Sequence, residues 1–211
     1  MRAIVTGGSR GIGKAIADHL RKEYEVLTIG RGEDNDIRAD LCLSHSSLIT
    51  EPVDVLVNNA GFQHYAPAVD YSMSEWYRQL EMMTAYFDLA RQAYQHGATR
   101  IINIASTAGM RGTRGAIGYS VAKAGVIHMT KCLSNEWAGK CTVNCIAPGF
   151  IETGMLDDAF RDKEHKERVR VYIPAGHFGE PADFIPVVEF LLRADYVTGA
   201  VITVDGGFTG L

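Results

Sequence analysis

Three residues near the middle of the chain have the types and the spacing that a proton-transfer site needs. Tyr119 and Lys123 stand four positions apart in a segment with helical periodicity, so their side chains share one face of the predicted helix. Ser106 comes thirteen positions before the tyrosine, just after a predicted strand. A Tyr-x-x-x-Lys pair arises by chance about 0.3 times in a chain of this composition, and adding the serine lowers that to about 0.01. Together the three residues indicate a catalytic site.

These residue types suit the reduction of a carbonyl group by a hydride from a nicotinamide cofactor. The developing alkoxide needs a proton, and a tyrosine with a pKa of about 10 exchanges one poorly at pH 7. An ammonium about 4 Å from the phenol would contribute about 4 kcal/mol at an effective dielectric constant of about 20, enough to lower the phenol pKa by about three. We therefore expect Lys123 to bring the pKa of Tyr119 close to neutrality and Ser106 to hold the substrate oxygen.

A second candidate site lies in a glycine-rich segment near the N-terminus. An apolar run is joined to a segment with helical spacing by Thr6-Gly7-Gly8-Ser9-Arg10-Gly11-Ile12-Gly13. Glycine lets the backbone approach a pyrophosphate closely, and the N–H groups at the start of the following helix favour its negative charge. In this strand-turn-helix context, we expect the segment to bind a dinucleotide.

The residues after the second predicted strand bear on which dinucleotide would bind. A carboxylate there would accept a hydrogen bond from the ribose 2′-hydroxyl of NAD(H) and repel the 2′-phosphate of NADP(H). The sequence has Arg31 in this place and a second arginine, Arg10, in the glycine-rich turn. Two guanidinium groups suit a phosphate, so we expect NADP(H) rather than NAD(H). The alternative is that Glu33 or Asp34 reaches the ribose, or that either arginine is only a solvated surface charge.

Strands and helices must alternate along the chain to position these residues. Residues 30–36 are too polar and too rich in glycine to hold a full helix. The pattern predicts one α/β domain over residues 1–211, a doubly wound Rossmann fold with a mostly parallel seven-stranded sheet and helices on both faces. Strands are predicted at residues 2–6, 25–29, 37–41, 53–57, 100–104, 142–146 and 200–204, and helices at 11–23, 74–96, 118–137 and 181–192, with a further short helix before the fourth strand.

Composition and charge exclude several classes of protein. The 211 residues are 46% hydrophobic and 22% charged, as is usual for a globular domain. A net charge of −4 provides no basic surface for nucleic acid. No apolar run reaches the roughly 20 residues of a transmembrane helix, and the N-terminus has no signal-peptide pattern, so we expect a cytoplasmic protein without membrane contact. The four cysteines form no metal-binding pattern, and we expect them to be reduced and mostly buried.

Residues 152–180 form the one long insertion at the end of the predicted sheet where ligands bind, and we expect them to act as a substrate lid. The alternative for the charged run at residues 161–168 is a solvated helix face. Arg111 and Arg114 follow Ser106 and either clamp a carboxylate or phosphate of an acidic substrate or remain surface charges. Other residues expected around the substrate are His64, Tyr65, Met110, Phe150, Met155 and His177.

These residues resemble the landmarks of the short-chain dehydrogenase/reductase family over nearly the whole chain. Further matching segments are Asp40-Leu41, Asn58-Asn59-Ala60-Gly61, Pro148-Gly149 and Val204-Asp205-Gly206-Gly207. The resemblance implies that Tyr119 is the acid/base, that Lys123 also bonds the nicotinamide ribose, and that the loops are most similar to those of sugar-acid dehydrogenases and 3-oxoacyl-carrier-protein reductases. With the glycine-rich turn and the two arginines argued above, the cofactor contacts expected from the turn through the adenine to the nicotinamide are Gly7, Ser9, Arg10, Gly11, Ile12, Gly13, Arg31, Asp40, Leu41, Asn59, Ala60, Gly61, Tyr119, Lys123, Pro148, Gly149, Ile151 and Thr153.

The sequence departs from the family pattern in two places. Members usually have a helix between the second and third strands, and residues 30–36 replace it here, so we expect one face of the sheet to be more exposed near the adenine. The family also has an asparagine in the long central helix that helps a water molecule relay protons to the lysine, and the aligned residue here is Met83. Methionine cannot bond that water, so either Thr84 or solvent substitutes, or turnover is slow.

The leading hypothesis is an NADP(H)-dependent oxidoreductase acting on a carbonyl or secondary alcohol. The alternative is a cofactor-binding protein with weak or no catalysis, a sensor or assembly partner, which Met83 and the missing helix would suit. A lyase or dehalogenase on the same fold is disfavoured because Lys123 and the glycine-rich turn are both present. The two long predicted helices, 74–96 and 118–137, carry apolar residues on more than one face, so we expect a homodimer or homotetramer.

Overall fold

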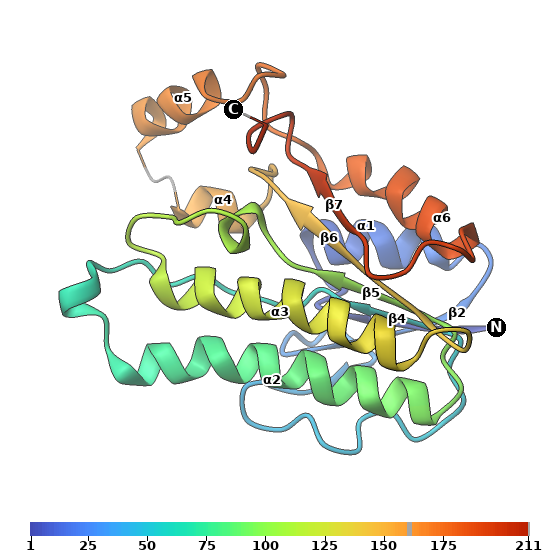
Figure 1. Ribbon diagram of the computed structural model, residues 1–211. Helices are drawn as coiled ribbons and strands as arrows, with labels where there is room; N and C mark the ends of the chain where they lie inside the picture. Colours follow the sequence, from blue (N-terminus) through green and yellow to red (C-terminus); the bar gives the residue numbers. More distant parts are fainter. Residues whose placement is uncertain (160–161, 211) are drawn as a thin grey trace.

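The computed structural model describes residues 1–159 and 162–210 and confirms the doubly wound α/β fold (Figure 1). Within these residues, seven strands run parallel in one sheet: β1 (Arg2–Thr6), β2 (Glu25–Gly30), β3 (Ile37–Arg38), β4 (Val55–Asn58), β5 (Arg100–Ile104), β6 (Thr142–Pro148) and β7 (Val201–Val204). Their order is β3-β2-β1-β4-β5-β6-β7. The order reverses between β1 and β4, so a ligand crevice is expected beyond the carboxyl ends of these two strands.

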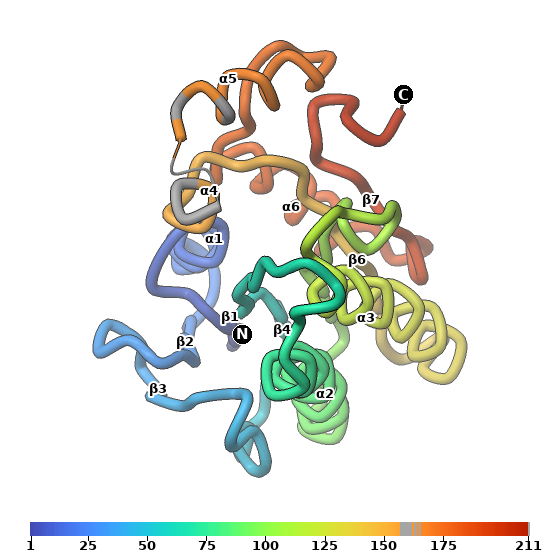
Figure 2. Tube along the Cα trace, turned by 90° about the vertical axis from the view of Figure 1, so that its left-hand side faces the viewer, coloured from blue at the N-terminus to red at the C-terminus, as the bar shows by residue number. Residues whose placement is uncertain are grey.

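Helices cover both faces of the sheet (Figures 1 and 2). The four helices that pack on it are α1 (Gly11–Leu20), α2 (Met73–Gln95), α3 (Ile117–Glu136) and α6 (Ile185–Arg193). Side chains along β1 alternate between two hydrophobic layers: Ala3 and Val5 pack with α1 and α6, and Ile4 packs with α2 and α3. Since both faces are buried, the strands read as continuous apolar runs in the sequence.

Local signals set the ends of the helices. The hydroxyl of Ser72 accepts a hydrogen bond from the N–H of Glu75 at 3.2 Å and caps the start of α2, which confirms the predicted long helix to within one residue. The predicted single helix at 181–192 is wrong, because a 3₁₀ turn, η3 (Pro181–Phe184), precedes α6. Pro186 in the first turn of α6 has no N–H, so it cannot make the hydrogen bond that would continue an α-helix from Pro181.

The segment between β2 and β3 is a short turn, as the sequence predicts. The carboxylate of Asp36 accepts hydrogen bonds from the N–H and the hydroxyl of Thr28, both at 2.8 Å, and so folds this turn back onto β2. The expectation of an exposed sheet face is therefore wrong at the end of β2, where Thr28 and Ile29 are buried.

The third strand is shorter than predicted, and the chain turns directly after it. Asp40 accepts hydrogen bonds from the N–H of Cys42 through its carboxylate (3.0 Å) and from the N–H of Ser44 through its carbonyl oxygen (2.9 Å), which ends the extended backbone. The short helix expected before β4 is wrong, since residues 39–54 are all described and contain no helix. The side chain of Gln92 on α2 holds this segment by accepting from the N–H of Ile49 at 3.0 Å.

The insertion at residues 152–180 contains two helices, α4 (Gly154–Ala159) and α5 (Lys163–Val171). Arg161, part of the predicted charged run, lies outside the described residues. All four cysteines are free, with Cys141 and Cys145 buried, Cys42 half-buried and Cys132 exposed. Over the described ranges, none of the helices has the length and apolar character to cross a membrane, and no group of His, Cys, Asp or Glu side chains is arranged to hold a metal ion.

Candidate active site

The glycine-rich turn joins β1 to α1 and is tied to the end of β4. The hydroxyl of Thr6 accepts hydrogen bonds from the N–H groups of Asn59 (2.8 Å) and Ala60 (2.9 Å). Gly7 has a φ of +66°, and a Cβ on Gly13 would lie 2.2 Å from the Gly7 carbonyl oxygen, so both positions need glycine. Among the described residues no side chain caps the start of α1, which leaves its first N–H groups for an anion.

Two adjoining cavities open at the carboxyl ends of the strands. A cleft of about 770 Å³ starts at the glycine-rich turn, and a second cavity of about 320 Å³ contains the predicted catalytic residues. Of the predicted cofactor residues, the cleft is lined by Gly7, Ser9, Arg10, Gly11, Ile12, Arg31, Asp40, Leu41, Asn59, Ala60, Gly61 and Thr153, and the second cavity by Tyr119, Lys123, Pro148, Gly149 and Ile151. Both are lined by Ile12, Asn59, Gly61, Thr153 and Met155, so one extended ligand could occupy the two.

At the far end of the cleft, the charged residues that bear on cofactor choice differ in their position and in their partners. Arg31 follows β2 with its Nη1 atom 3.9 Å from Oδ2 of Asp40. Glu33 pairs with Arg38 at 3.7 Å and does not line the cleft. Of the two carboxylates that the sequence offers to a ribose, Asp34 alone lines it.

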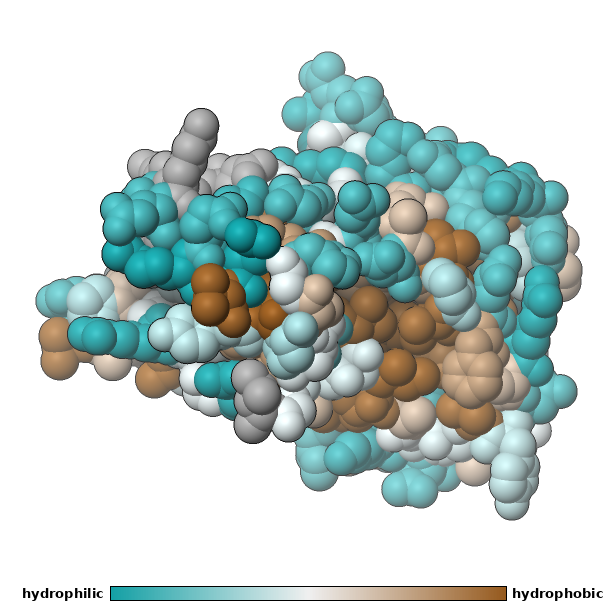
Figure 3. All heavy atoms as spheres, turned by 90° about the horizontal axis from the view of Figure 1, so that it is seen from above, coloured by the Kyte–Doolittle hydropathy of each residue, from teal (hydrophilic) through white to brown (hydrophobic). Residues whose placement is uncertain are grey.

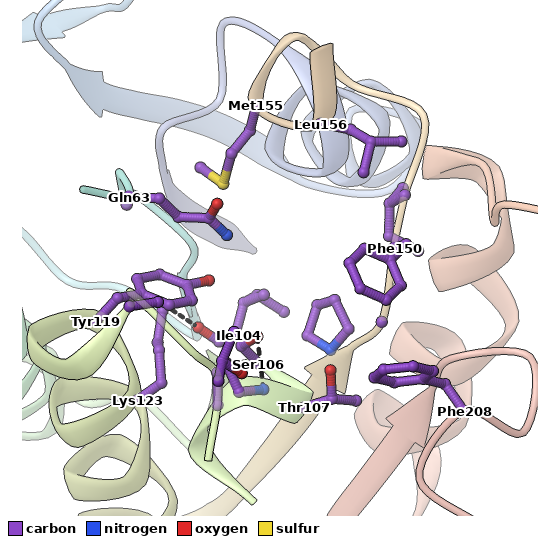
Figure 4. Close-up of a pocket in the computed structure, with 18 of the residues that line it drawn as sticks. Gln63, Ile104, Ser106, Thr107, Tyr119, Lys123, Phe150, Met155, Leu156 and Phe208 are labelled. Carbon is purple, nitrogen blue, oxygen red and sulfur yellow. Dashed lines mark hydrogen bonds between the residues drawn. The ribbon is translucent and has the colours of Figure 1, made fainter. Parts of the chain in front are cut away.

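Ser106, Tyr119 and Lys123 are brought together in the second cavity (Figure 4). Ser106 lies two residues after the end of β5 and caps the 3₁₀ turn η2 (Thr107–Gly109), its Oγ accepting from the N–H of Ala108 at 3.1 Å. Tyr119 and Lys123 lie on adjacent turns near the start of α3, and all three residues are buried. The Lys123 Nζ atom donates to the carbonyl oxygen of Ile104 at 2.7 Å and lies 5.8 Å from the centre of the Tyr119 ring.

Burial controls the protonation of this pair. It raises the pKa of Tyr119 above 10, although interactions with the Gln63 and Ser106 side chains act in the opposite direction. It also lowers the pKa of Lys123 to about 8. The expectation that Lys123 lowers the pKa of Tyr119 is therefore wrong in this structure, because the loss of hydration outweighs the other effects. At pH 7 the phenol keeps its proton and the lysine is charged.

The structure adds two polar residues that the sequence analysis missed. Gln63 lies in the loop after β4 and faces the Tyr119 hydroxyl, as Figure 4 shows. Tyr86 on α2 is fully buried and receives a hydrogen bond from Lys123 at 3.4 Å. For Gln63, the sequence offers a weak signal, its position two residues after the Asn59-Ala60-Gly61 segment. The sequence contains none for Tyr86, which reads as a core aromatic residue in a periodic helix.

The outer part of the second cavity is lined by apolar side chains and by two arginines. Of the residues expected around the substrate, Tyr65, Phe150, Met155, Arg111 and Arg114 line it, whereas His64, Met110 and His177 do not. Leu156 and Phe208 complete the apolar wall. The Arg111 guanidinium stacks 4.6 Å from the centre of the Phe208 ring and donates to the Phe208 carbonyl oxygen at 3.4 Å. Within the described part of the chain, no carboxylate lines this cavity, and Arg114 is exposed without a partner.

Met82 and Met83 of the central helix, α2, lie on its side that faces α3. Both Met82 and Met83 line a small cavity that also contacts Lys123, but only Met82 reaches the cofactor cleft. Met83 instead packs against Gly125, where a Cβ would meet its sulfur. Thr84 does not substitute for the expected asparagine, because it is exposed and its hydroxyl donates to Leu80 of its own helix at 3.1 Å.

Comparisons with known proteins show which family the chain resembles. A family model described as enoyl-(acyl carrier protein) reductase matches residues 40–209. The acetoacetyl-CoA reductase of Rhizobium meliloti is 35% identical and the 3-oxoacyl-[acyl-carrier-protein] reductase of Aquifex aeolicus 34% identical, each over 97% of this chain, with 97% and 96% of the relative covered.

Solved structures show the same kinship. A putative NAD(P)-dependent gluconate 5-dehydrogenase from Beutenbergia cavernae with bound NADP is 34% identical, with a TM-score of 0.91 over 100% of this chain and 97% of that one. A putative 2-deoxy-D-gluconate 3-dehydrogenase from Agrobacterium tumefaciens with bound NADP is 32% identical, with a TM-score of 0.91 over 100% and 96%. The chain therefore belongs to the short-chain dehydrogenase/reductase family of oxidoreductases.

Proposed function

We propose that this protein is an NADP(H)-dependent oxidoreductase that transfers a hydride between nicotinamide and a carbonyl or secondary alcohol substrate, with Tyr119 as the acid/base. The observation that carries the proposal is the convergence of Ser106, Tyr119 and Lys123 in a buried cavity that adjoins the cleft at the glycine-rich turn. A nicotinamide cofactor that filled the cleft would end beside these three side chains.

The residues present fit a dinucleotide. Gly7 and Gly13 let the turn pack closely against itself and against Asn59, and the uncapped start of α1 leaves backbone N–H groups that would hold a pyrophosphate. Asp40 and Leu41 would flank the adenine, and Ile151, Thr153 and the remaining cleft residues would hold the nicotinamide half. When bound, the nicotinamide supplies or accepts the hydride.

The protonation states favour reduction at neutral pH. Because burial raises the pKa of Tyr119, the phenol holds a proton that it can give to the substrate oxygen as the carbonyl is reduced. Ser106 Oγ accepts from the N–H of Ala108, so its own hydrogen is free to point at the same substrate oxygen. In the oxidative direction Tyr119 must first lose its proton, which requires alkaline pH.

Arg10 and Arg31 support NADP(H) as the cofactor. Both line the adenosine end of the cleft, where a 2′-phosphate would gain charge-assisted hydrogen bonds. The NADP bound in the two solved relatives is consistent with this assignment. NAD(H) is the weaker alternative, and it would depend on Asp34.

The charge of the second cavity supports an acidic substrate. Arg111, Arg114 and Lys123 line it, and no carboxylate does so in the described ranges. Since Arg111 is engaged with Phe208, Arg114 is the cation available to a carboxylate or phosphate on the substrate. The apolar wall would contact the carbon chain. Residues 152–180, which contribute Thr153, Met155 and Leu156, would act as the lid of a single domain spanning residues 1–211.

We place the protein in the cytoplasm as a homodimer or homotetramer, and its exposed apolar surface supports this assembly. Figure 3 shows apolar side chains gathered in a hollow near α6 and β7. Phe190 on α6 is 51% exposed, and Tyr77, Phe87 and Val121 on the two long helices are exposed as well. Because α6 and the two long helices lie on opposite faces of the sheet, separate partner chains would cover these two sets of side chains and the open edge of β7. Sedimentation or light scattering would give the mass, and a monomer would count against this assembly.

One experiment separates catalysis from binding alone. The protein is mixed with NADPH and a panel of sugar acids, oxo acids and oxoacyl thioesters, and NADPH oxidation is followed by absorbance while NADPH binding is followed by fluorescence. We expect turnover with at least one ketone, and we expect Tyr119→Phe to abolish turnover while keeping NADPH binding. A wild-type protein that binds NADPH and turns over nothing is the cofactor-binding alternative, and a wild-type protein that binds no dinucleotide contradicts both.

A further inference from the structure

Beside Lys123, the long helix α2 places a second buried tyrosine. Tyr86 has no exposed surface, and its hydroxyl lies 2.9 Å from the carbonyl oxygen of Ala60, just past β4, and 3.3 Å from that of Ile104, at the end of β5. The Nζ atom of Lys123 lies 3.4 Å from this hydroxyl and 5.0 Å from the centre of the ring. The phenol therefore links the ends of two central strands to the buried ammonium.

The numbers of donors and acceptors determine the direction of these hydrogen bonds. The phenol has one proton, and the nearer acceptor is the Ala60 carbonyl, so the phenol oxygen is left to accept from Lys123. The ammonium has three N–H donors, of which one goes to Ile104 and one to Tyr86. One donor remains, and a Cβ on Gly61, which lines the cofactor cleft, would lie 3.7 Å from Nζ.

Few groups stabilise the positive charge of Lys123. No carboxylate lines either cavity beside it within the described residues. The titratable groups around it are Tyr119 on α3, Tyr86 on α2 and Cys145 on β6, and burial raises the pKa of each, so they stay neutral at pH 7. Gln79 shares the small cavity, but its buried amide nitrogen is a donor that cannot help an ammonium. One carbonyl oxygen, one phenol oxygen and two aromatic faces therefore stabilise the charge.

We propose that Tyr86 is a positioning residue whose phenol oxygen holds the Lys123 ammonium so that its remaining N–H group points toward the cofactor cleft. The role in catalysis depends on the proposed oxidoreductase function, whereas the contact itself exists in the folded protein with or without turnover. Tyr86 touches neither cleft directly, so its effect on the reaction acts through Lys123.

The kinetic test compares Tyr86→Phe with the wild-type protein in the NADPH assay. Without the phenol oxygen, the buried ammonium loses one of two acceptors, and the pKa of Lys123 falls further below about 8. We expect the alkaline limb of the kcat profile to move about one pH unit lower and kcat at pH 8 to fall about fivefold, with KM for the ketone unchanged. Tyr94→Phe is the matched control on the same helix, where the ring stacks on Trp137 and no activity change is expected.

A second test needs no turnover. Unfolding in urea gives the equilibrium constant of unfolding for the wild type, Tyr86→Phe, Lys123→Met and the double variant. These four constants form a double-mutant cycle. We expect the double variant to differ by about tenfold from the product of the two single effects, because both substitutions remove the same contact. For the control pair Tyr94→Phe and Lys123→Met, the effect of the double variant on the unfolding constant should agree within about twofold with the product of the two single effects.

The two tests fail in different ways. A wild-type protein without turnover contradicts the proposed function, and the cycle then still decides whether the phenol holds the lysine. An additive cycle overturns the proposal, whatever the activity. A coupled cycle with an unchanged pH profile in Tyr86→Phe also overturns it, because the contact would then be structural only.

Discussion

Replacing Lys123 by methionine should make the folded protein more stable at neutral pH. The lysine is buried, and its pKa of about 8, against 10.5 in the unfolded chain, means that charging it costs the folded state about 3 kcal/mol (10.5 − 8 = 2.5, at about 1.36 kcal/mol per pH unit). Methionine has a similar volume and no charge, so it should fill the site with little strain. We expect the free energy of unfolding of Lys123→Met to exceed that of the wild type by about 3 kcal/mol at pH 7.

The difference should disappear at alkaline pH. A folded-state pKa below the unfolded value means that between about pH 8 and 10.5 the unfolded chain binds more protons, so this lysine makes wild-type stability rise with pH. Below pH 8 both states are charged and the full cost applies. The pKa values of Cys141 and Cys145 are raised by burial to about 12 and about 11, which destabilises the protein above pH 9. The effect of Cys141 is the same in both proteins, whereas the Lys123 charge lowers the pKa of Cys145, so the variant loses slightly more stability than the wild type above pH 9.

Urea unfolding followed by circular dichroism, at one protein concentration and at several pH values from 7 to 10, measures the difference directly. Lys131→Met is the control, since Lys131 lies on the same helix but is exposed, and its replacement should change stability little at any pH. A Lys123→Met protein that is no more stable than the wild type at pH 7, or a gap that does not close as pH rises, would refute this electrostatic account of the site.

Three further predictions concern the ligand sites. Gly13→Ala would place a Cβ 2.2 Å from the Gly7 carbonyl oxygen, so NADPH affinity should fall at least about tenfold in a fluorescence titration; wild-type affinity would show that the turn does not bind the cofactor. Arg31→Ala should weaken NADPH binding about threefold to tenfold and leave NADH binding unchanged, and equal losses for both would contradict a 2′-phosphate contact. Arg114→Ala should raise KM for acidic ketones about threefold to tenfold while uncharged ketones are unaffected, and an unaltered KM for the acids would exclude Arg114 from substrate binding.

The sequence by itself determined the features that depend on local spacing. The glycine-rich turn between a strand and a helix, and the four-residue interval that puts Tyr119 and Lys123 on one face of α3, follow from backbone periodicity and could be read directly. The polar segment that replaces a helix between β2 and β3 was equally visible. Each of these patterns involves residues that are close along the chain, so no knowledge of packing was needed.

Only the tertiary structure decided which other groups surround Tyr119 and Lys123 and how these two residues are protonated. Tyr86 reaches Lys123 from α2, and Gln63 reaches Tyr119 from the loop after β4, contacts that span 37 and 56 positions of the chain. From the sequence, an ammonium about 4 Å from the phenol at an effective dielectric constant of about 20 predicted a lowered pKa for Tyr119, with the charge as the one effect considered. In the folded protein both side chains are buried, and because dehydration penalises the charged form of each, it raises the pKa of the phenol and lowers that of the amine.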